Sequence, residues 1–330
     1  MSRRNISVSV DRLKRRPSGT PTRKLPADDR SCPKCSSHYR AEELRRALGV
    51  CGTCGHHFVV GARERISQLA EGGAWTELWT ELRASDPLQF VDTEPYPDRV
   101  ERAEAKGTNE ALVVGEVQVR GMPCIVAAMD FPFLGGSMGA VVGEKLYRAA
   151  ERCAQQGLPL VVVSSSGGAR MQEGVIALMQ MAKTVVAFEL LRDAELPTVV
   201  VLCHPTTGGV WASFASLGDI TYAEPGALIS FAGPRVIEQT TREKLAPDFG
   251  LAERQLANGQ VDDVVDRREL PARIGKVLGI LDRPRAQMEP APAVTWAQGR
   301  AEKVARVARA LPARAKGAVA RVRGQDGGSR

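Results

Sequence analysis

The sequence of 330 residues contains no run that approaches the ~18–20 apolar residues of a membrane-spanning helix. Its basic N-terminus, which includes Arg3, Arg4 and Lys14, has no apolar stretch behind it, so a secretory signal is excluded. We therefore expect no membrane span and a cytoplasmic location. The chain also lacks the GxSxG and HExxH catalytic signatures, and it lacks the GxxxxGK[ST] and GxGxxG nucleotide loops.

What is present is an ordinary globular composition with an uneven distribution of charge. Hydrophobic residues make up 43% and charged residues 25%, which allows a sizeable core. The net charge of +7 arises at the ends, because residues 1–30 and 296–330 each carry nine Lys or Arg and few acids. We expect a disordered basic tail over 1–27 and a basic, flexible tail over 291–330. A short amphipathic helix in the second tail is the alternative.

Four cysteines form the most specific local pattern. Cys32 and Cys35 enclose two residues, fifteen residues follow, and Cys51 and Cys54 repeat the spacing. Two Cys-x-x-Cys pairs at this separation bring four thiolates around one tetrahedral Zn²⁺ ion. Four thiolates close the site, so we expect a structural zinc ribbon over residues 28–58. The flanking histidines that compete as ligands are His38, His56 and His57.

Hydrophobic periodicity predicts the elements that follow the ribbon. We expect a helix over 61–85, strands over 112–119 and 124–129, and a helix over roughly 142–155. Residues 159–170 and 197–210 then each read as a buried strand, a turn of small residues and a helix start. This repetition predicts an α/β superhelix of β-β-α units whose strands end at one edge. The two turns would then lie side by side.

Each of these turns places glycine where a helix begins, with Gly167 and Gly168 in the first and Gly208 and Gly209 in the second. Such steps expose backbone N–H groups, and the helix dipole strengthens their attraction for a negative oxygen. They suit a carbonyl oxygen that becomes negative, a phosphate group, or a purely structural turn.

No side chain stands out as the base of such a site. His204 precedes a proline at a strand end, where it is either a base or a structural residue. An oxyanion site without its own base indicates that the substrate or cofactor supplies the proton acceptor.

Together these motifs resemble the carboxyltransferase β-subunit family of bacterial acetyl-CoA carboxylase over about residues 28–283. The matching segments keep the order of the family: the cysteine ribbon ending in Cys54-Gly-His-His57, then 133–143, 166–173, 179–184, 205–209, 215–219 and 231–240. The resemblance implies a crotonase-like (ClpP/crotonase) fold for residues 59–290.

The resemblance also implies a reaction and its partners. In the family a β and an α subunit share the active site in an α2β2 assembly, which works with a biotin carboxylase and a biotin carboxyl carrier protein. Carboxybiotin on the carrier gives its carboxyl group to acetyl-CoA, a CoA thioester, and malonyl-CoA forms for fatty acid synthesis. Decarboxylation leaves a basic ureido anion that takes the α-proton of the thioester. This base accounts for the missing side chain.

The expected catalytic groups are backbone donors to the enolate oxygen. We assign them to Gly208 and Gly209, with Gly168 and Ala169 as the neighbouring pair. The expected cofactor-binding residues are Gly167, Arg170, Arg235 and Trp211. Arg170 either binds CoA phosphate or forms a buried ion pair with Glu173, and Arg235 has the same two interpretations.

The sequence departs from the family beside the second turn. The family has Asp-Pro-Thr-Thr-Gly-Gly-Val followed by a small residue, whereas this chain has His204 and Trp211 at the two differing positions. The Trp211 ring either fills a gap in the core or reshapes an acyl or inhibitor pocket. In the second case the chain would be a specialised paralogue that is insensitive to inhibitors or dedicated to one pathway.

Two other functions compete with carboxyl transfer. A nucleic-acid-binding protein would use the basic tails and the cations of the ribbon, Lys34, Arg40, Arg45 and Arg46. A decarboxylating relative that acts on malonyl-CoA would share the fold and its oxyanion sites, but the ribbon argues against it.

Overall fold

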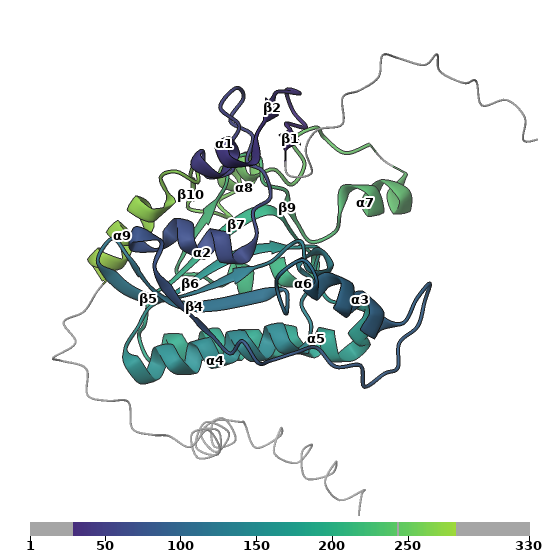
Figure 1. Ribbon diagram of the computed structural model, residues 1–330, viewed down its shortest axis with the longest axis horizontal. Helices are drawn as coiled ribbons and strands as arrows, with labels where there is room; N and C mark the ends of the chain where they lie inside the picture. Colours follow the sequence, from purple (N-terminus) through teal and green to yellow (C-terminus); the bar gives the residue numbers. More distant parts are fainter. Residues whose placement is uncertain (1–28, 243, 282–330) are drawn as a thin grey trace, which may run out of the picture.

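The computed structural model describes residues 29–242 and 244–281 (Figure 1). The strands are β1 Arg30–Ser31, β2 His38–Tyr39, β3 Trp75–Leu78, β4 Leu112–Val119, β5 Met122–Met129, β6 Leu160–Ser166, β7 Thr198–Thr207, β8 Ile220–Ala223, β9 Ile229–Ser230 and β10 Asp263–Val264. The helices are α1 Ala41–Arg46, α2 Ala62–Leu69, α3 Tyr96–Glu104, α4 Ala140–Gln156, α5 Gly174–Asp193, α6 Gly208–Trp211, α7 Pro234–Thr241, α8 Ala252–Ala257 and α9 Leu270–Leu281. Short 3₁₀ turns are η1 Glu71–Gly73, η2 Leu134–Gly136, η3 Met171–Glu173 and η4 Phe214–Ser216. The two predicted tails, 1–27 and 291–330, lie outside these residues.

An eight-stranded mixed sheet organises the fold. Its strand order is β10-β8-β7-β6-β5-β4-β3, and β9 pairs with the end of β7. Strands β5, β6, β7, β8 and β10 run parallel, whereas β3, β4 and β5 pair antiparallel. Because parallel neighbours end at the same edge, the segments that follow β6 and β7 meet there.

Alternating side chains divide the core between the two faces of this sheet. On β5, Ile125 and Ala127 join a cluster with α4 and α5, whereas Val126 and Ala128 join a second cluster with α2 and α9. Figure 1 accordingly shows α4 and α5 below the sheet and α2 and α9 above it. Both faces are buried, which explains the nearly continuous apolar runs of the central strands.

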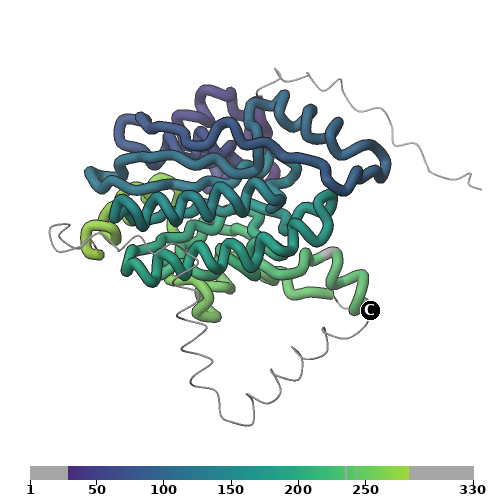
Figure 2. Tube along the Cα trace, turned by 90° about the horizontal axis from the view of Figure 1, so that it is seen from below, coloured from purple at the N-terminus to yellow at the C-terminus, as the bar shows by residue number. Residues whose placement is uncertain are grey.

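Helices α4 and α5 lie side by side under the sheet, as the view in Figure 2 shows. The segment Met171–Asp193 is also long and apolar enough to cross a membrane, judged by length and composition alone. A core helix of a soluble protein passes the same test, and here α5 buries Ala187, Phe188 and Leu191 in the cluster shared with α4. The helix therefore has a structural role in this fold.

The predicted helix over 61–85 is wrong beyond Leu69. Helix α2 ends there, and the chain turns through Gly72 and Gly73, whose φ angles are 61° and 74°. It then forms β3, which pairs antiparallel with β4. The apolar spacing that indicated one long helix is therefore shared between a short helix and an edge strand, and the glycine pair marks the boundary.

The other predicted elements are confirmed. Strand β4 covers the predicted 112–119, β5 includes 124–129, and α4 includes 142–155. The two later units are β6 followed by η3 and α5, and β7 followed by α6. Strand β7 pairs with β8 through residues 199–202, and its last two residues, Thr206 and Thr207, pair with the short strand β9.

Candidate active site and metal centre

The two glycine turns lie in contact at the carboxyl ends of β6 and β7. A Cβ built on Gly168 would lie 3.3 Å from the Cα of Gly208 and 3.4 Å from the backbone nitrogen of Gly209. Gly168 and Gly208 have positive φ angles of 117° and 63°, which side-chain-bearing residues rarely adopt. The predicted side-by-side arrangement of the turns is therefore confirmed.

Of the four backbone N–H groups expected to be donors, two are already used in hydrogen bonds within the fold and two are not. The N–H of Gly168 donates to Ser166 Oγ (3.0 Å), and the N–H of Gly208 donates to the Phe231 carbonyl (2.9 Å). Within residues 29–242 and 244–281, the N–H groups of Ala169 and Gly209 have no hydrogen-bond acceptor. Both residues are half-buried.

The free donors belong to neighbouring segments. A Cβ on Gly209 would lie 3.7 Å from the Cβ of Ala169 and 3.1 Å from Met181 Sδ on α5. Gly209 is the second residue of α6, where N–H groups have no partner within the helix. The two residues that carry the free N–H groups therefore lie next to each other, and two neighbouring donors suit a single negative oxygen.

The first turn is held in place by strand pairing. The N–H of Gly167 donates to the Gly135 carbonyl (2.9 Å), and the N–H of Met138 donates to the Gly168 carbonyl (2.8 Å). The N–H of Arg170, directly after the turn, donates to the Met138 carbonyl (3.0 Å). The parallel bridge between Met138 and Ala169 directs the N–H of Ala169 away from Met138. Gly167 therefore supports the turn through its backbone.

The Arg170 guanidinium lies behind the first turn and is fully buried. It forms ion pairs with Glu110 and, at 3.1 Å, with Glu173, and it donates to the Tyr96 hydroxyl at 3.1 Å. Burial alone would lower the pKa of Arg170, but the two carboxylates outweigh it and raise this pKa. Of the two interpretations of Arg170, the structure supports the buried ion pair, because the guanidinium does not reach the surface.

Trp211 ends helix α6 and is half-buried. Its ring packs against the core cluster under the sheet and also lines a surface hollow of about 270 Å³. Phe231 and Phe249 supply two further rings of this hollow, and polar side chains such as Arg254 and Gln255 complete it. Trp211 therefore fills space in the core and also forms the wall of a cavity two residues from Gly209.

His204 and Arg235 lie outside the two glycine turns, His204 in β7 and Arg235 in α7. His204 Nδ1 accepts a hydrogen bond from the Leu228 N–H (3.2 Å), and desolvation lowers the pKa of the imidazole. A ring nitrogen already used in this way favours the structural interpretation of His204. Arg235 lies in α7, which projects from the body of the domain (Figure 1).

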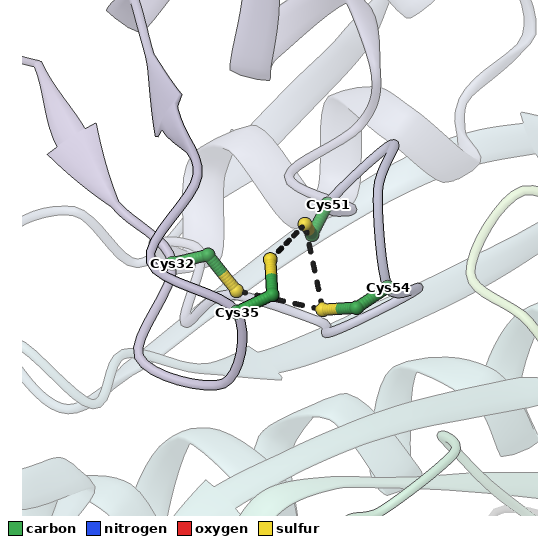
Figure 3. Close-up of side chains that lie close together, drawn as sticks. All are labelled: Cys32, Cys35, Cys51 and Cys54. Atoms are coloured by element: carbon green, nitrogen blue, oxygen red, sulfur yellow. Dashed lines mark hydrogen bonds between the residues drawn. The ribbon is translucent and has the colours of Figure 1, made fainter.

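The four cysteines converge at one point of the ribbon (Figure 3). The Sγ–Sγ distances are 3.6 Å for Cys32–Cys54, 3.6 Å for Cys35–Cys51 and 3.5 Å for Cys51–Cys54. A tetrahedral ion with Zn–S bonds of about 2.3 Å requires sulfur atoms about 3.8 Å apart. The geometry therefore fits one tetrahedral metal ion.

Polar neighbours favour the thiolate form of Cys51. Burial opposes its ionisation, but the Tyr39 hydroxyl 3.1 Å from Sγ and backbone N–H groups of the second knuckle lower the pKa of this thiol to about 5. A metal ion requires the deprotonated ligand, so the surroundings of Cys51 assist binding, whereas burial raises the pKa of the neighbouring Cys54 thiol to about 12. The neighbouring His57 points elsewhere, toward Asp266 (3.4 Å), and does not compete as a ligand.

Comparison with known proteins identifies the family of the chain. The family model described as a carboxyl transferase domain matches residues 63–320. The chain belongs to the carboxyl transferase family. A relative from Pelobacter propionicus, named acetyl-coenzyme A carboxylase carboxyl transferase subunit beta, is 51% identical over 256 residues, or 77% of this chain and 90% of the relative. A relative of the same name from Thermus thermophilus is 48% identical over 274 residues, or 82% and 95%.

Solved structures of a transcarboxylase and of a malonate decarboxylase share the fold. The transcarboxylase 12S structure with hydrolysed methylmalonyl-coenzyme A aligns with a TM-score of 0.56 at 26% identity over 66% of this chain, and this chain spans 40% of that subunit. A Pseudomonas malonate decarboxylase hetero-tetramer aligns with a TM-score of 0.56 at 24% identity, over 82% and 95% of the two chains. The crotonase-like fold expected for this member of the family is confirmed.

Sequence reasoning missed the buried charges that support this carboxyl transferase site. Glu110 is 60 residues from its partner Arg170, and no local pattern marks it. Glu224, which follows β8, pairs with Arg65 and Arg267 in the same way. For Glu224 the sequence offers one signal, an acidic residue directly after an apolar strand. The signal does not identify its partners, because Arg65 and Arg267 come from distant segments.

Proposed function

We propose that this chain is the β subunit of an acetyl-CoA carboxylase carboxyltransferase. It transfers the carboxyl group of carboxybiotin, held on a biotin carboxyl carrier protein, to acetyl-CoA, and malonyl-CoA is the product. The observation that carries the proposal is the pair of free N–H groups of Ala169 and Gly209 on adjoining turns. The names of the relatives from Pelobacter and Thermus support the choice of substrate.

The two N–H groups stabilise the enolate oxygen of the acetyl thioester. Proton removal from the methyl group places negative charge on the thioester oxygen, and two fixed donors bind this charge more strongly than the neutral carbonyl. The base is the ureido anion that remains when carboxybiotin loses its carboxyl group. His204 is not needed for this step, which agrees with its bond to Leu228.

A partner surface lies beside the free donors. Five large apolar side chains on one side of η3 and α5 are exposed, with exposed fractions from 43% to 72%: Met171, Val175, Leu178, Met179 and Val185. Met181, on the same helix, reaches Gly209. An exposed apolar stripe of this kind marks an interface, and we assign it to the carboxyltransferase α subunit of an α2β2 assembly. Donors of that subunit would bind the ureido oxygen of biotin.

The remaining components follow from the same proposal. The ribbon holds one structural Zn²⁺ ion through Cys32, Cys35, Cys51 and Cys54, because the four-sulfur set is the one that zinc prefers in closed sites. A biotin carboxylase recharges the carrier. The complex works in the cytoplasm, and Gly167 and Arg235 remain candidate contacts for the CoA thioester.

Reconstitution with an α subunit tests the function. The chain is mixed with the carboxyltransferase α subunit of one of the related bacteria, and malonyl-CoA formation from acetyl-CoA and carboxylated carrier protein is followed. Activity is expected only when both subunits and carboxylated carrier are present. The absence of product with a stable two-subunit complex would show that the proposal is wrong.

A specialised paralogue is a second candidate, and the position of Trp211 favours it. Its ring forms a wall of the hollow beside the second turn, where the family has a small residue. A comparison of acetyl-CoA with propionyl-CoA as acceptors in the reconstituted enzyme separates the two candidates. Nucleic-acid binding through the ribbon is a weaker secondary property, and competition by added RNA at low salt would reveal it.

A further inference from the structure

A buried carboxylate joins three segments above the sheet. Glu224, which is 1% exposed, directly follows β8. Its carboxylate lies 2.8 Å from Arg65 Nη1 of α2 and 2.7 Å from Arg267 Nη2, which precedes α9. The two guanidinium groups are also buried, so one carboxylate and two cations occupy an interior position.

The zinc ribbon completes this charge cluster. Arg267 Nη1 donates to the carbonyl oxygens of Leu48 (3.0 Å) and Gly49 (3.3 Å), both between the two cysteine pairs. His57, three residues after Cys54, places Nδ1 3.4 Å from Glu224. We call Glu224, Arg65, Arg267 and His57 the clasp. Leu48, Gly49 and His57 flank Cys51 and Cys54 in the chain, so the folded ribbon sets their positions.

The clasp also touches the strand that carries the second turn. The N–H of Glu224 donates to the Leu202 carbonyl of β7 (2.9 Å). A small hollow between ribbon and sheet, lined by clasp residues, is bordered by Ser165, Cys203 and His204. Strand β7 runs from there through Thr207 into Gly208. The clasp therefore contacts the last part of β7, the strand that leads into the second turn.

Buried charges make this contact sensitive to the state of the ribbon. Burial opposes ionisation of Glu224, but Arg65, Arg267 and His57 outweigh it and hold the pKa of its carboxyl well below the usual range. A buried charged group that loses its hydrogen-bond acceptors is left unsatisfied, and this costs free energy of folding. A ribbon that unfolds removes His57 and the two carbonyl acceptors of Arg267 together.

We propose that the clasp couples metal loading of the ribbon to the stability of the sheet. Metal binding folds the ribbon, and the folded ribbon completes the clasp. Linkage is reciprocal, so an intact clasp also strengthens metal retention, although no clasp residue is a ligand. The proposal is independent of the acceptor substrate, because its consequences are measured without catalysis.

Zinc release from the full-length chain tests the coupling. The zinc-loaded protein is mixed with excess EDTA, and the rate of zinc loss is measured for the wild type and for Arg267→Met. This substitution keeps Glu224 paired with Arg65 and removes the bonds to Leu48 and Gly49. We expect zinc loss about tenfold faster, within the usual range of coupling between sites.

A matched variant separates coupling from general loss of stability. Leu191→Ala truncates a buried side chain of α5 in the cluster on the opposite face of the sheet. It lowers the melting temperature but is expected to leave the rate of zinc loss unchanged. His57→Asn, which shortens a clasp side chain, is expected to accelerate zinc loss and is the replacement if Arg267→Met does not fold.

The thermal shift on zinc removal supplies the second measurement. Zinc removal should lower the melting temperature of the wild type more than that of Arg267→Met, because the variant is already uncoupled. Equal shifts in both proteins would overturn the proposal. So would equal rates of zinc loss in Arg267→Met, His57→Asn and the wild type.

Discussion

Gly168 and Gly208 approach each other so closely that a Cβ on residue 208 would lie 3.0 Å from the Cα of Gly168. The contact joins the first turn after β6 to the second turn after β7. It sets the spacing of the Ala169 and Gly209 N–H groups, which the proposed reaction uses together. The two turns can approach this closely only because neither Gly168 nor Gly208 carries a side chain.

Gly208→Ala is expected to lower the free energy of unfolding by more than the cost of its positive φ angle, because the new Cβ also collides with Gly168. The φ angle of 63° costs about 1–2 kcal/mol for alanine, and the clash with Gly168 adds about 1–3 kcal/mol. Gly226→Ala is the matched control, because Gly226 has a φ of 68° and nothing within 4 Å of its Cβ position. Urea unfolding measures both variants. Equal losses would show that the close approach does not constrain the fold.

Gly209→Pro is expected to remove one oxyanion donor and leave the fold in place. Proline lacks the N–H but is tolerated in the first turn of a helix, where Gly209 lies. Loss of one such donor costs about 3 kcal/mol, or a decrease in kcat of roughly 10²–10³-fold. Gly209→Ala retains the N–H and meets only the flexible Met181 side chain, so it is expected to lose far less. Similar kcat values for the two variants would remove Gly209 from the catalytic groups.

Arg170→Met tests the buried ion cluster behind the first turn. The substitution leaves Glu110 and Glu173 without their cation, and such a loss costs about 3–5 kcal/mol. We expect a large decrease in the free energy of unfolding. A normally stable Arg170→Met protein with a selective increase in KM for acetyl-CoA would instead favour contact with CoA phosphate.

Much of the site is predictable from the sequence because it depends on local patterns. The four-cysteine spacing and the order of strand, small-residue turn and helix each lie within a short segment, and β4, α4 and the paired turns were found at their predicted positions. The predicted helix over 61–85 is wrong because its apolar spacing also suits an edge strand, and the partner strand β4 decides between the two.

The buried charge pairs lie beyond such patterns. Glu110 and Arg170 meet across 60 residues, and Arg267 meets the Gly49 carbonyl across 218. Nothing beside either residue indicates its partner, because the fold alone brings the segments together. The N–H groups that remain free, Ala169 and Gly209, are likewise decided by the acceptors that the tertiary structure supplies.

Trp211→Ser tests whether this chain differs in specificity from its relatives. The substitution restores a small residue and enlarges the hollow of about 270 Å³ that Phe231 and Phe249 also line. If the ring limits the space beside Gly209, the preference for propionyl-CoA over acetyl-CoA should rise about tenfold, which is the usual effect of fitting one methylene group. Trp211→Phe keeps an aromatic wall and should retain the original preference. The ratio of kcat/KM for the two acceptors in the reconstituted enzyme is the measurement. Unchanged ratios in Trp211→Ser, with a lower melting temperature, would assign the ring to core packing alone.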